Sequence, residues 1–465
     1  MNNSLVFKDS SQKRAKAISE NLITEGSIWK ALLTFFFPIL FGTFFQQLYN
    51  TVDTIVVGRF VGKQALAAVG GGTAVFVNLL VGFFVGLTSG AGVLISQFYG
   101  AKDKIHISRA VHTAITLCAI GGIIMTIAGI SLSRPMMVIT KTPQELLELS
   151  TLYLKIYFLG MIPMFIYNMG SGILRAVGNS KTPLLILIVG CFSNILLDLL
   201  FVVIFKQGVR GVALATVICQ TESAILTLVI LAKSRDSYRF NPKELGITPH
   251  ILGQILKIGF PAGIQSVLYT VSNLIIQTNI NSFGTNAVAA WATYGKVDAI
   301  FWMMVSAFGI AVTTFAGQNY GAKKYDRVWR GMYQTLIMTS VFTLIFCVFF
   351  WYFGGFIFLL FTEDAEVISL GVEMLHFLTP WWLSYISIEI LSGTIRGTGE
   401  SLVPTLITVF GVCILRILWL FVAVPMNNTI NMVMASYPIT WSVTSIAFWG
   451  YYAVLKHKFA HKVLP

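Results

Sequence analysis

Long apolar stretches, separated by short polar segments, occupy most of the chain. Twelve of them reach or approach the ~20 residues that a helix needs to cross a bilayer. The pattern predicts an all-α membrane protein with twelve transmembrane spans, at residues 30–58, 65–97, 105–131, 145–174, 181–206, 210–233, 253–283, 287–317, 328–353, 365–395, 401–424 and 429–456.

The second half of the chain repeats the first. Segment 97–102 (QFYGAK) reappears 221 residues later as 318–323 (QNYGAK), and Arg175 has its counterpart in Arg396 at the same spacing. Each half holds six predicted spans, so both run in the same direction, related by an axis along the membrane normal, an arrangement found in secondary transporters. We expect an N-terminal segment, an N-lobe, a linker, a C-lobe and a tail at 1–29, 30–233, 234–252, 253–456 and 457–465.

Composition supports a membrane location. The chain is 56% hydrophobic and 11% charged, whereas a soluble domain carries roughly 25% charged residues. The five cysteines lie within apolar stretches, and their spacing indicates neither a metal site nor a disulfide framework.

Basic residues alternate along the chain. Of the 32 Lys and Arg residues, 23 fall in or beside the N-terminal segment, the even-numbered gaps between spans and the C-terminal tail, and 6 fall in the odd-numbered gaps. By the positive-inside rule both termini are cytoplasmic. The net charge of +13 is then explained by contact with anionic membrane lipids. We therefore predict a multi-pass protein of the inner (plasma) membrane that contacts lipids and binds no nucleic acid.

Acidic residues within the spans are the leading functional candidates, because an ionisable group in hydrocarbon is costly and tends to mark a pathway or a pair. Asn194 and Asp198 are four residues apart, on one helix face. Asp198 and Thr216 are equally far from the turn near Gln207, and Asp53 is expected at a similar depth in the first span. Such oxygen ligands suit a hard cation, and a proton can take the place of a metal ion because two nearby carboxylates raise each other's proton affinity. The alternative is that each Asp only caps or bonds a neighbouring helix.

The second repeat has no matching set of acids, so any ion site belongs to the N-lobe. Glu389 is the repeat counterpart of Asn168; it attracts a cationic cargo or pairs with a base, and the sequence leaves both open. A salt bridge between Asp298 and Arg416 is the preferred interpretation of those two residues. Pro38 permits a hinge or imposes a fixed bend in the first span.

The repeated Gln-x-Tyr-Gly-Ala-Lys elements are interpreted as span ends, with Gly100 and Gly321 as helix C-caps. The chain contains no Walker A motif, and its six histidines show no metal-ligand spacing. These patterns predict a protein that is not an enzyme and that needs no cofactor other than H⁺ or Na⁺ as coupling ion.

Several segments together resemble the multidrug and toxic compound extrusion (MATE) family: 37–53 (FPILFGTFFQQLYNTVD), 57–58 (VG), 65–70 (ALAAVG), both Gln-x-Tyr-Gly-Ala-Lys elements and both Arg-x-x-Gly turns. The resemblance extends over about residues 28–455. It implies two six-helix lobes arranged as a V around a central cavity, and export of drugs in exchange for inward-moving H⁺ or Na⁺.

Within the family the chain is similar to the DinF-like branch. That resemblance implies an N-lobe ion site at Asp53, Asn194, Asp198 and Thr216, and bending of the first span at Pro38. The NorM-like branch instead has acids in spans 7 and 10; this chain lacks the span 7 acid, and Glu389 is a loose counterpart of the other. The residues expected to line the substrate cavity are Gln46, Tyr49, Asn50, Asn168 and Glu389.

The sequence therefore predicts a monomeric secondary transporter that exports amphipathic, cationic organic compounds in exchange for H⁺ or Na⁺. The alternative is a flippase for lipids or lipid-linked oligosaccharides of the same superfamily, which would favour a more cationic cavity. A membrane-embedded enzyme would need a nucleophile at the depth of Asp53 and Asp198. A channel is disfavoured by the duplicated lobes and the lack of a filter-like ring.

Overall fold

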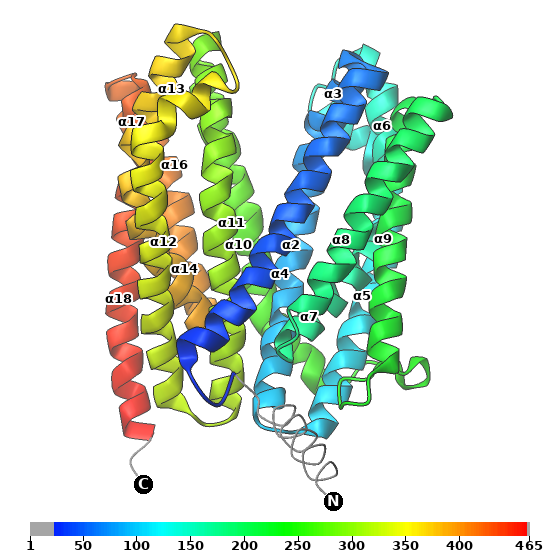
Figure 1. Ribbon diagram of the computed structural model, residues 1–465, viewed down its shortest axis with the longest axis vertical. Helices are drawn as coiled ribbons and strands as arrows, with labels where there is room; N and C mark the ends of the chain where they lie inside the picture. Colours follow the sequence, from blue (N-terminus) through cyan, green and yellow to red (C-terminus); the bar gives the residue numbers. More distant parts are fainter. Residues whose placement is uncertain (1–22, 463–465) are drawn as a thin grey trace, which may run out of the picture.

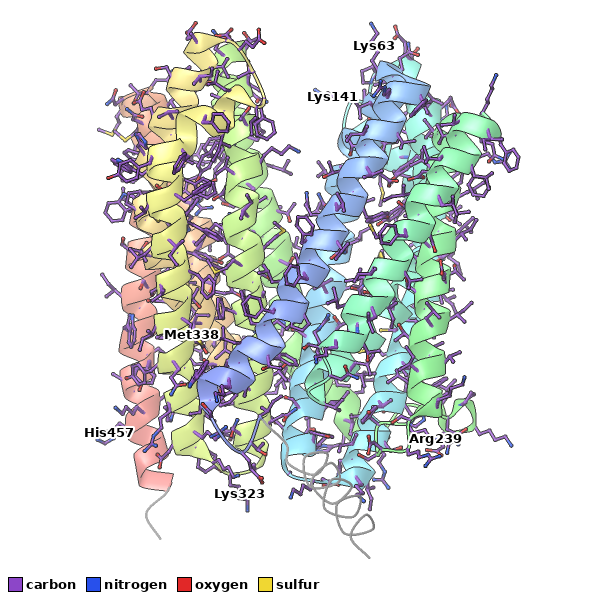
Figure 2. All side chains as sticks on the ribbon, in the orientation of Figure 1. Lys63, Lys141, Arg239, Lys323, Met338 and His457 are labelled. Carbon is purple, nitrogen blue, oxygen red and sulfur yellow. The ribbon has the colours of Figure 1, made fainter. Side chains whose placement is uncertain are left out.

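The computed structural model describes residues 23–462, and all regular secondary structure in that range is helical. The predicted segments 1–29 and 457–465 therefore lie partly outside the described residues. Two helix bundles converge at one end of the molecule and diverge toward the other (Figure 1). We call these ends the terminal side, which carries Arg239, Lys323 and His457, and the far side, which carries Lys63 and Lys141 (Figure 2).

The first bundle is the predicted N-lobe. It consists of α2 (Ile28–Val56), the π-helix η1 (Val57–Val61), α3 (Lys63–Gly70), α4 (Gly72–Gly100), α5 (Lys104–Ile139), α6 (Gln144–Leu159), α7 (Met161–Ala176), α8 (Lys181–Asp198), the π-helix η2 (Leu199–Ile204) and α9 (Gly208–Lys233).

The second bundle is the predicted C-lobe, reached through a linker that contains η3 (Pro242–Glu244). It consists of α10 (Pro249–Asn281), α11 (Thr285–Gly321), α12 (Tyr325–Leu359), α13 (Ala365–Leu378), η4 (Thr379–Trp381), α14 (Trp382–Gly397), α15 (Leu402–Thr408), the π-helix η5 (Val409–Ile414), α16 (Leu415–Met426), α17 (Ile430–Met434) and α18 (Ser436–Lys462).

A helix or a short series of helices occupies each of the twelve predicted spans, which confirms the all-α membrane fold. Among residues 23–462, nine helices are long and apolar enough to cross a membrane, and α6 with α7 forms a tenth span bent by 50°. The remaining two predicted spans correspond to α13–α14 and α17–α18. The sequence did not predict these breaks, because the apolar composition continues across them.

The lobes share an extended contact where α4 crosses α10. A Cβ atom added at Gly86 would collide with the main chain of Gly263, and one added at Gly90 would collide with the main chain of Gly259. Helices in a bilayer gain little from the hydrophobic effect when they associate, and small residues stabilise their contact by letting the two backbones approach closely. The α4–α10 crossing is therefore a contact between backbones.

Helix α2 belongs to both lobes. Near the terminal side, fully buried Phe36 stacks on Phe308 of α11, with ring centroids 3.8 Å apart. From there α2 runs toward the far side and packs along α8 of the N-lobe (Figure 1). Pro38 lies inside the helix, close to the Phe36 contact. The hinge at Pro38 stays a prediction, since its position next to this contact suits a bend of either kind.

The segment that precedes α2 is held on the C-lobe. The Arg327 guanidinium, at the start of α12, donates hydrogen bonds to the main-chain oxygens of Ile23, Glu25 and Gly26 at 3.3, 3.0 and 2.8 Å. Lys324 Nζ donates to Thr24 O at 2.9 Å. Basic side chains of the C-lobe therefore hold the start of α2, whose other end packs in the N-lobe.

We expect Arg327→Gln to lower the free energy of unfolding by about 2 kcal/mol, because hydrogen bonds to a charged group contribute ~1.5–3 kcal/mol. Thermal unfolding in detergent measures the change. Arg330→Gln is the matched control, since Arg330 is exposed on the same helix. Equal melting temperatures for the two variants would contradict this role of Arg327.

Candidate functional site

The four predicted ion-site residues lie on three helices of the N-lobe, toward the far side. Asp53 is near the end of α2, Asn194 and Asp198 are in the last turns of α8, and Thr216 is in α9. A short turn joins η2 to α9, so that Asp198 lies on one side of this turn and Thr216 on the other. Asn194, Asp198 and Thr216 are 0%, 0% and 4% exposed, and Asp53 is half-buried.

These buried side chains present oxygen atoms without donors. Within residues 23–462, no hydrogen-bond partner is found for either carboxyl oxygen of Asp198, for Oδ1 of Asp53, or for the Asn194 amide. The Thr216 hydroxyl donates to Val212 O at 3.1 Å, and the same side chain interacts with Tyr49. Unpaired buried acceptors are costly, so this arrangement fits a cation that these oxygen atoms could coordinate.

The Asp53 and Asp198 side chains interact with each other electrostatically. Two ionised carboxylates have no proton to donate, and their like charges repel. Neither takes part in an ion pair of the described chain. A shared proton or a bound cation would offset this repulsion, and two carboxylates, an amide oxygen and a hydroxyl are hard ligands of the kind that suit Na⁺.

Three tyrosines interact with the acidic pair, and the sequence predicted a site role only for Tyr49. Tyr49 interacts with Thr216 and Asp53. Tyr153 and Tyr157 of α6 interact with Asp53 and stack on each other, with ring centroids 6.0 Å apart. The four-residue spacing of Tyr153 and Tyr157 places both on one helix face. That spacing was the signal that would have identified them.

Each carboxylate also lies just before a π-helix. Asp198 is the residue before η2, and Asp53 lies four residues before η1. The two π-helices contact each other at the far side. Because π-helical turns are wider than α-helical ones and occur often at functional sites, they add an independent structural mark to this part of the N-lobe.

The residues predicted to line the substrate cavity lie in different environments. Gln46 and Asn50 are exposed along α2, and Tyr49 is half-buried between them. Asn168 donates to Met164 O of its own helix at 2.8 Å. Glu389 lies in the C-lobe, where the Tyr385 hydroxyl donates to it at 3.4 Å. The assignment of these five residues to a cavity stays a prediction.

The predicted salt bridge between Asp298 and Arg416 is wrong for this structure, since no ion pair joins them within the described residues. Asp298 instead accepts hydrogen bonds from Trp302 Nε1 at 2.6 Å and from the Tyr294 hydroxyl at 3.2 Å. The Arg416 guanidinium lies 4.2 Å from the centre of the Tyr437 ring. Equal depth in two spans does not specify partners, because aromatic donors and rings compete for both charges.

Comparison with known proteins gives an independent result. Residues 38–200 and 261–422 match the family model described as MatE. The probable multidrug resistance protein YoeA of Bacillus subtilis is 30% identical over 439 residues, which cover 92% of this chain and 94% of YoeA. The multidrug export protein MepA of Staphylococcus aureus is 24% identical over 408 residues, or 84% of this chain and 87% of MepA.

Solved structures show the same fold. A multidrug resistance MATE family transporter in an outward-facing conformation superposes with a TM-score of 0.86 at 22% identity, covering 94% of this chain and 98% of that one. A MATE structure in a bent conformation has a TM-score of 0.87 at the same identity and coverage. Among relatives found by sequence, the probable multidrug resistance protein NorM of Thermotoga maritima is 26% identical over 85% of this chain and 86% of NorM. The DinF-like assignment stays a prediction.

Proposed function

From the premise that this chain belongs to the MatE family and is a multidrug efflux transporter, we propose that inward flow of a cation through Asp53 and Asp198 drives its export cycle. The single observation that carries this proposal is a pair of interacting carboxylates whose buried oxygens have neither a hydrogen-bond donor nor an ion-pair partner in the described chain. Such a pair is costly unless a positive ion is bound for part of the cycle.

Binding must differ between two conformations for the ion to do work, since a ligand shifts an equilibrium only by its differential affinity. Asp53 and Asp198 lie on separate helices, α2 and α8. A change in the path of α2 alters the distance between the carboxylates and therefore the affinity for the ion. Because the base of α2 packs on the C-lobe, this change is linked to the relative position of the lobes.

We assign the terminal side to the cytoplasm, with both termini inside the cell. The distribution of Lys and Arg supports this orientation. The lobes diverge toward the far side (Figure 1), which would then face outward. The acidic candidate Glu389 favours amphipathic cationic cargo, and the coupling ion is H⁺ or Na⁺. We propose that one chain, in contact with membrane lipids, performs the whole cycle.

Purified protein in liposomes tests ion coupling. A pH gradient and a Na⁺ gradient are imposed in separate experiments, and the movement of ethidium is followed by fluorescence. We expect one of the gradients to move ethidium against its own concentration gradient, in the direction opposite to the ion. Equal rates with either gradient and with none would contradict ion-coupled exchange.

A further inference from the structure

Two hydrogen bonds connect the lobes at the terminal side, and they are repeat counterparts. Gln97 Nε2, near the end of α4, donates to Gly397 O of α14 at 2.8 Å. Gln318 Nε2, near the end of α11, donates to Ala176 O of α7 at 2.7 Å. Donors and acceptors are each 221 residues apart. Each lobe therefore gives one amide donor to the other lobe and receives one.

The accepting carbonyls are available for a physical reason. Gly397 and Ala176 are the last residues of α14 and α7, and the final four carbonyls of a helix have no partner within it. The turns that follow contain Gly178 and Gly399, both with φ of +93°, a conformation that glycine adopts at no steric cost. Each glutamine thus caps a helix end of the opposite lobe.

Glycines bring the donors within reach. A Cβ atom added at Gly100 would collide with the main-chain oxygen of Gln318, and one added at Gly321 would collide with that of Gln97. The predicted C-cap role of these glycines is wrong, since both are still helical and the left-handed residues are Lys102 and Lys323, each with φ of +58°. The ends of α4 and α11 therefore touch across the pseudo-twofold axis.

We propose that Gln97 and Gln318 are positioning residues that hold the terminal side closed. Both bonds join the end of a helix in one lobe to the end of a helix in the other. When the lobes separate at this side to admit cargo, both bonds must break, because the repeat axis relates them. This inference rests on the alternation of lobe positions in the proposed function, and it does not depend on the identity of the coupling ion.

The expected size of the effect follows from the net contribution of a hydrogen bond. Loss of one bond worth about 1 kcal/mol changes the ratio of closed to open molecules roughly fivefold. Loss of both changes it by roughly 25-fold if the two contributions add.

The test measures the separation of the lobes at the terminal side. Lys181 and Leu402 are exposed repeat counterparts that begin α8 and α15. Spin labels at Lys181→Cys and Leu402→Cys, in protein whose five native cysteines are replaced, report the distance by double electron–electron resonance. Gln97→Met and Gln318→Met keep side-chain length and remove the amide donor. Each is expected to increase the population at longer distance, and the double variant is expected to increase it further.

Gln334→Met, in α12, is the matched control, because Gln334 Oε1 has no hydrogen-bond partner in the described chain. Its distance distribution should equal that of the unsubstituted protein. If Gln318→Met does not fold, Gln97→Met decides the question, since Gln97 is only half-buried. An unchanged distribution for a folded Gln97→Met protein would overturn the proposal. Ethidium transport is measured in the same variants. If ion coupling is absent, gradient-driven transport fails but the distance shift remains, so the two proposals fail in different ways.

Discussion

Asp53→Asn and Asp198→Asn are each expected to reduce ion-driven ethidium efflux by at least roughly tenfold, the scale of coupling between linked sites. An amide cannot take up a proton as a carboxylate does, and it removes one negative charge from the cation ligands. Efflux from cells that contain equal amounts of each protein measures the loss. Efflux at the unsubstituted rate in both variants would remove the coupling role.

The substitution Asp198→Asn should also increase the free energy of unfolding. Asp198→Asn removes a buried charge whose oxygens have no donor in the described chain, so we expect a gain of about 1–3 kcal/mol in the free energy of unfolding. Asp298→Asn is the matched control: its carboxylate accepts from Trp302 and Tyr294, and the amide loses charge-assisted hydrogen bonds. We expect that variant to be less stable and to retain ion-driven efflux. Opposite shifts in melting temperature would support the distinction, and parallel losses would contradict it.

Gly86→Ala is expected to prevent assembly of the two lobes. The new methyl group would meet the main chain of Gly263 and Ala262, and a backbone cannot rotate out of the way as a side chain can. Overpacking costs ~1–3 kcal/mol where neighbours can adjust and more where they cannot. Size-exclusion chromatography of a fluorescent fusion should show loss of the monodisperse peak.

Gly92→Ala, in the same helix, is the control for this substitution. A Cβ atom at Gly92 has one neighbour within 4 Å, Gly172 O at 3.9 Å. Alanine also favours the helical backbone over glycine by about 1 kcal/mol. We therefore expect a normal chromatographic peak. Similar behaviour of the two variants would show that contact between backbones is not what limits assembly.

The sequence predicted the helical spans well because hydrophobic length, the property that sets a span, is local. Spans expected at 65–97 and 287–317 correspond to Lys63–Gly100 and Thr285–Gly321. The sequence also predicted a short turn between the helices that carry Asp198 and Thr216, and the structure has that turn between η2 and α9. These inferences required no knowledge of which helices are neighbours.

Partners of side chains were harder to predict, because they depend on how helices pack. Asp298 takes its donors from an aromatic cluster rather than from Arg416, and depth alone does not select between them. Gly100 was interpreted as a local cap, whereas its role is to let Gln318 of the other lobe approach. The repeat was the available signal, since two nearly identical short segments at equivalent positions of the two halves favour a contact about the repeat axis.

The attachment of α2 at both ends has a geometric consequence. Between Phe36 and Asp53 the helix advances about 25 Å, at ~1.5 Å per residue. One residue inserted between these points would turn the far end by ~100° about the helix axis, and Asp53 would point away from Asp198. The number of residues between Phe36 and Asp53 therefore cannot change even by one, whereas the length of surface loops elsewhere in the chain can vary.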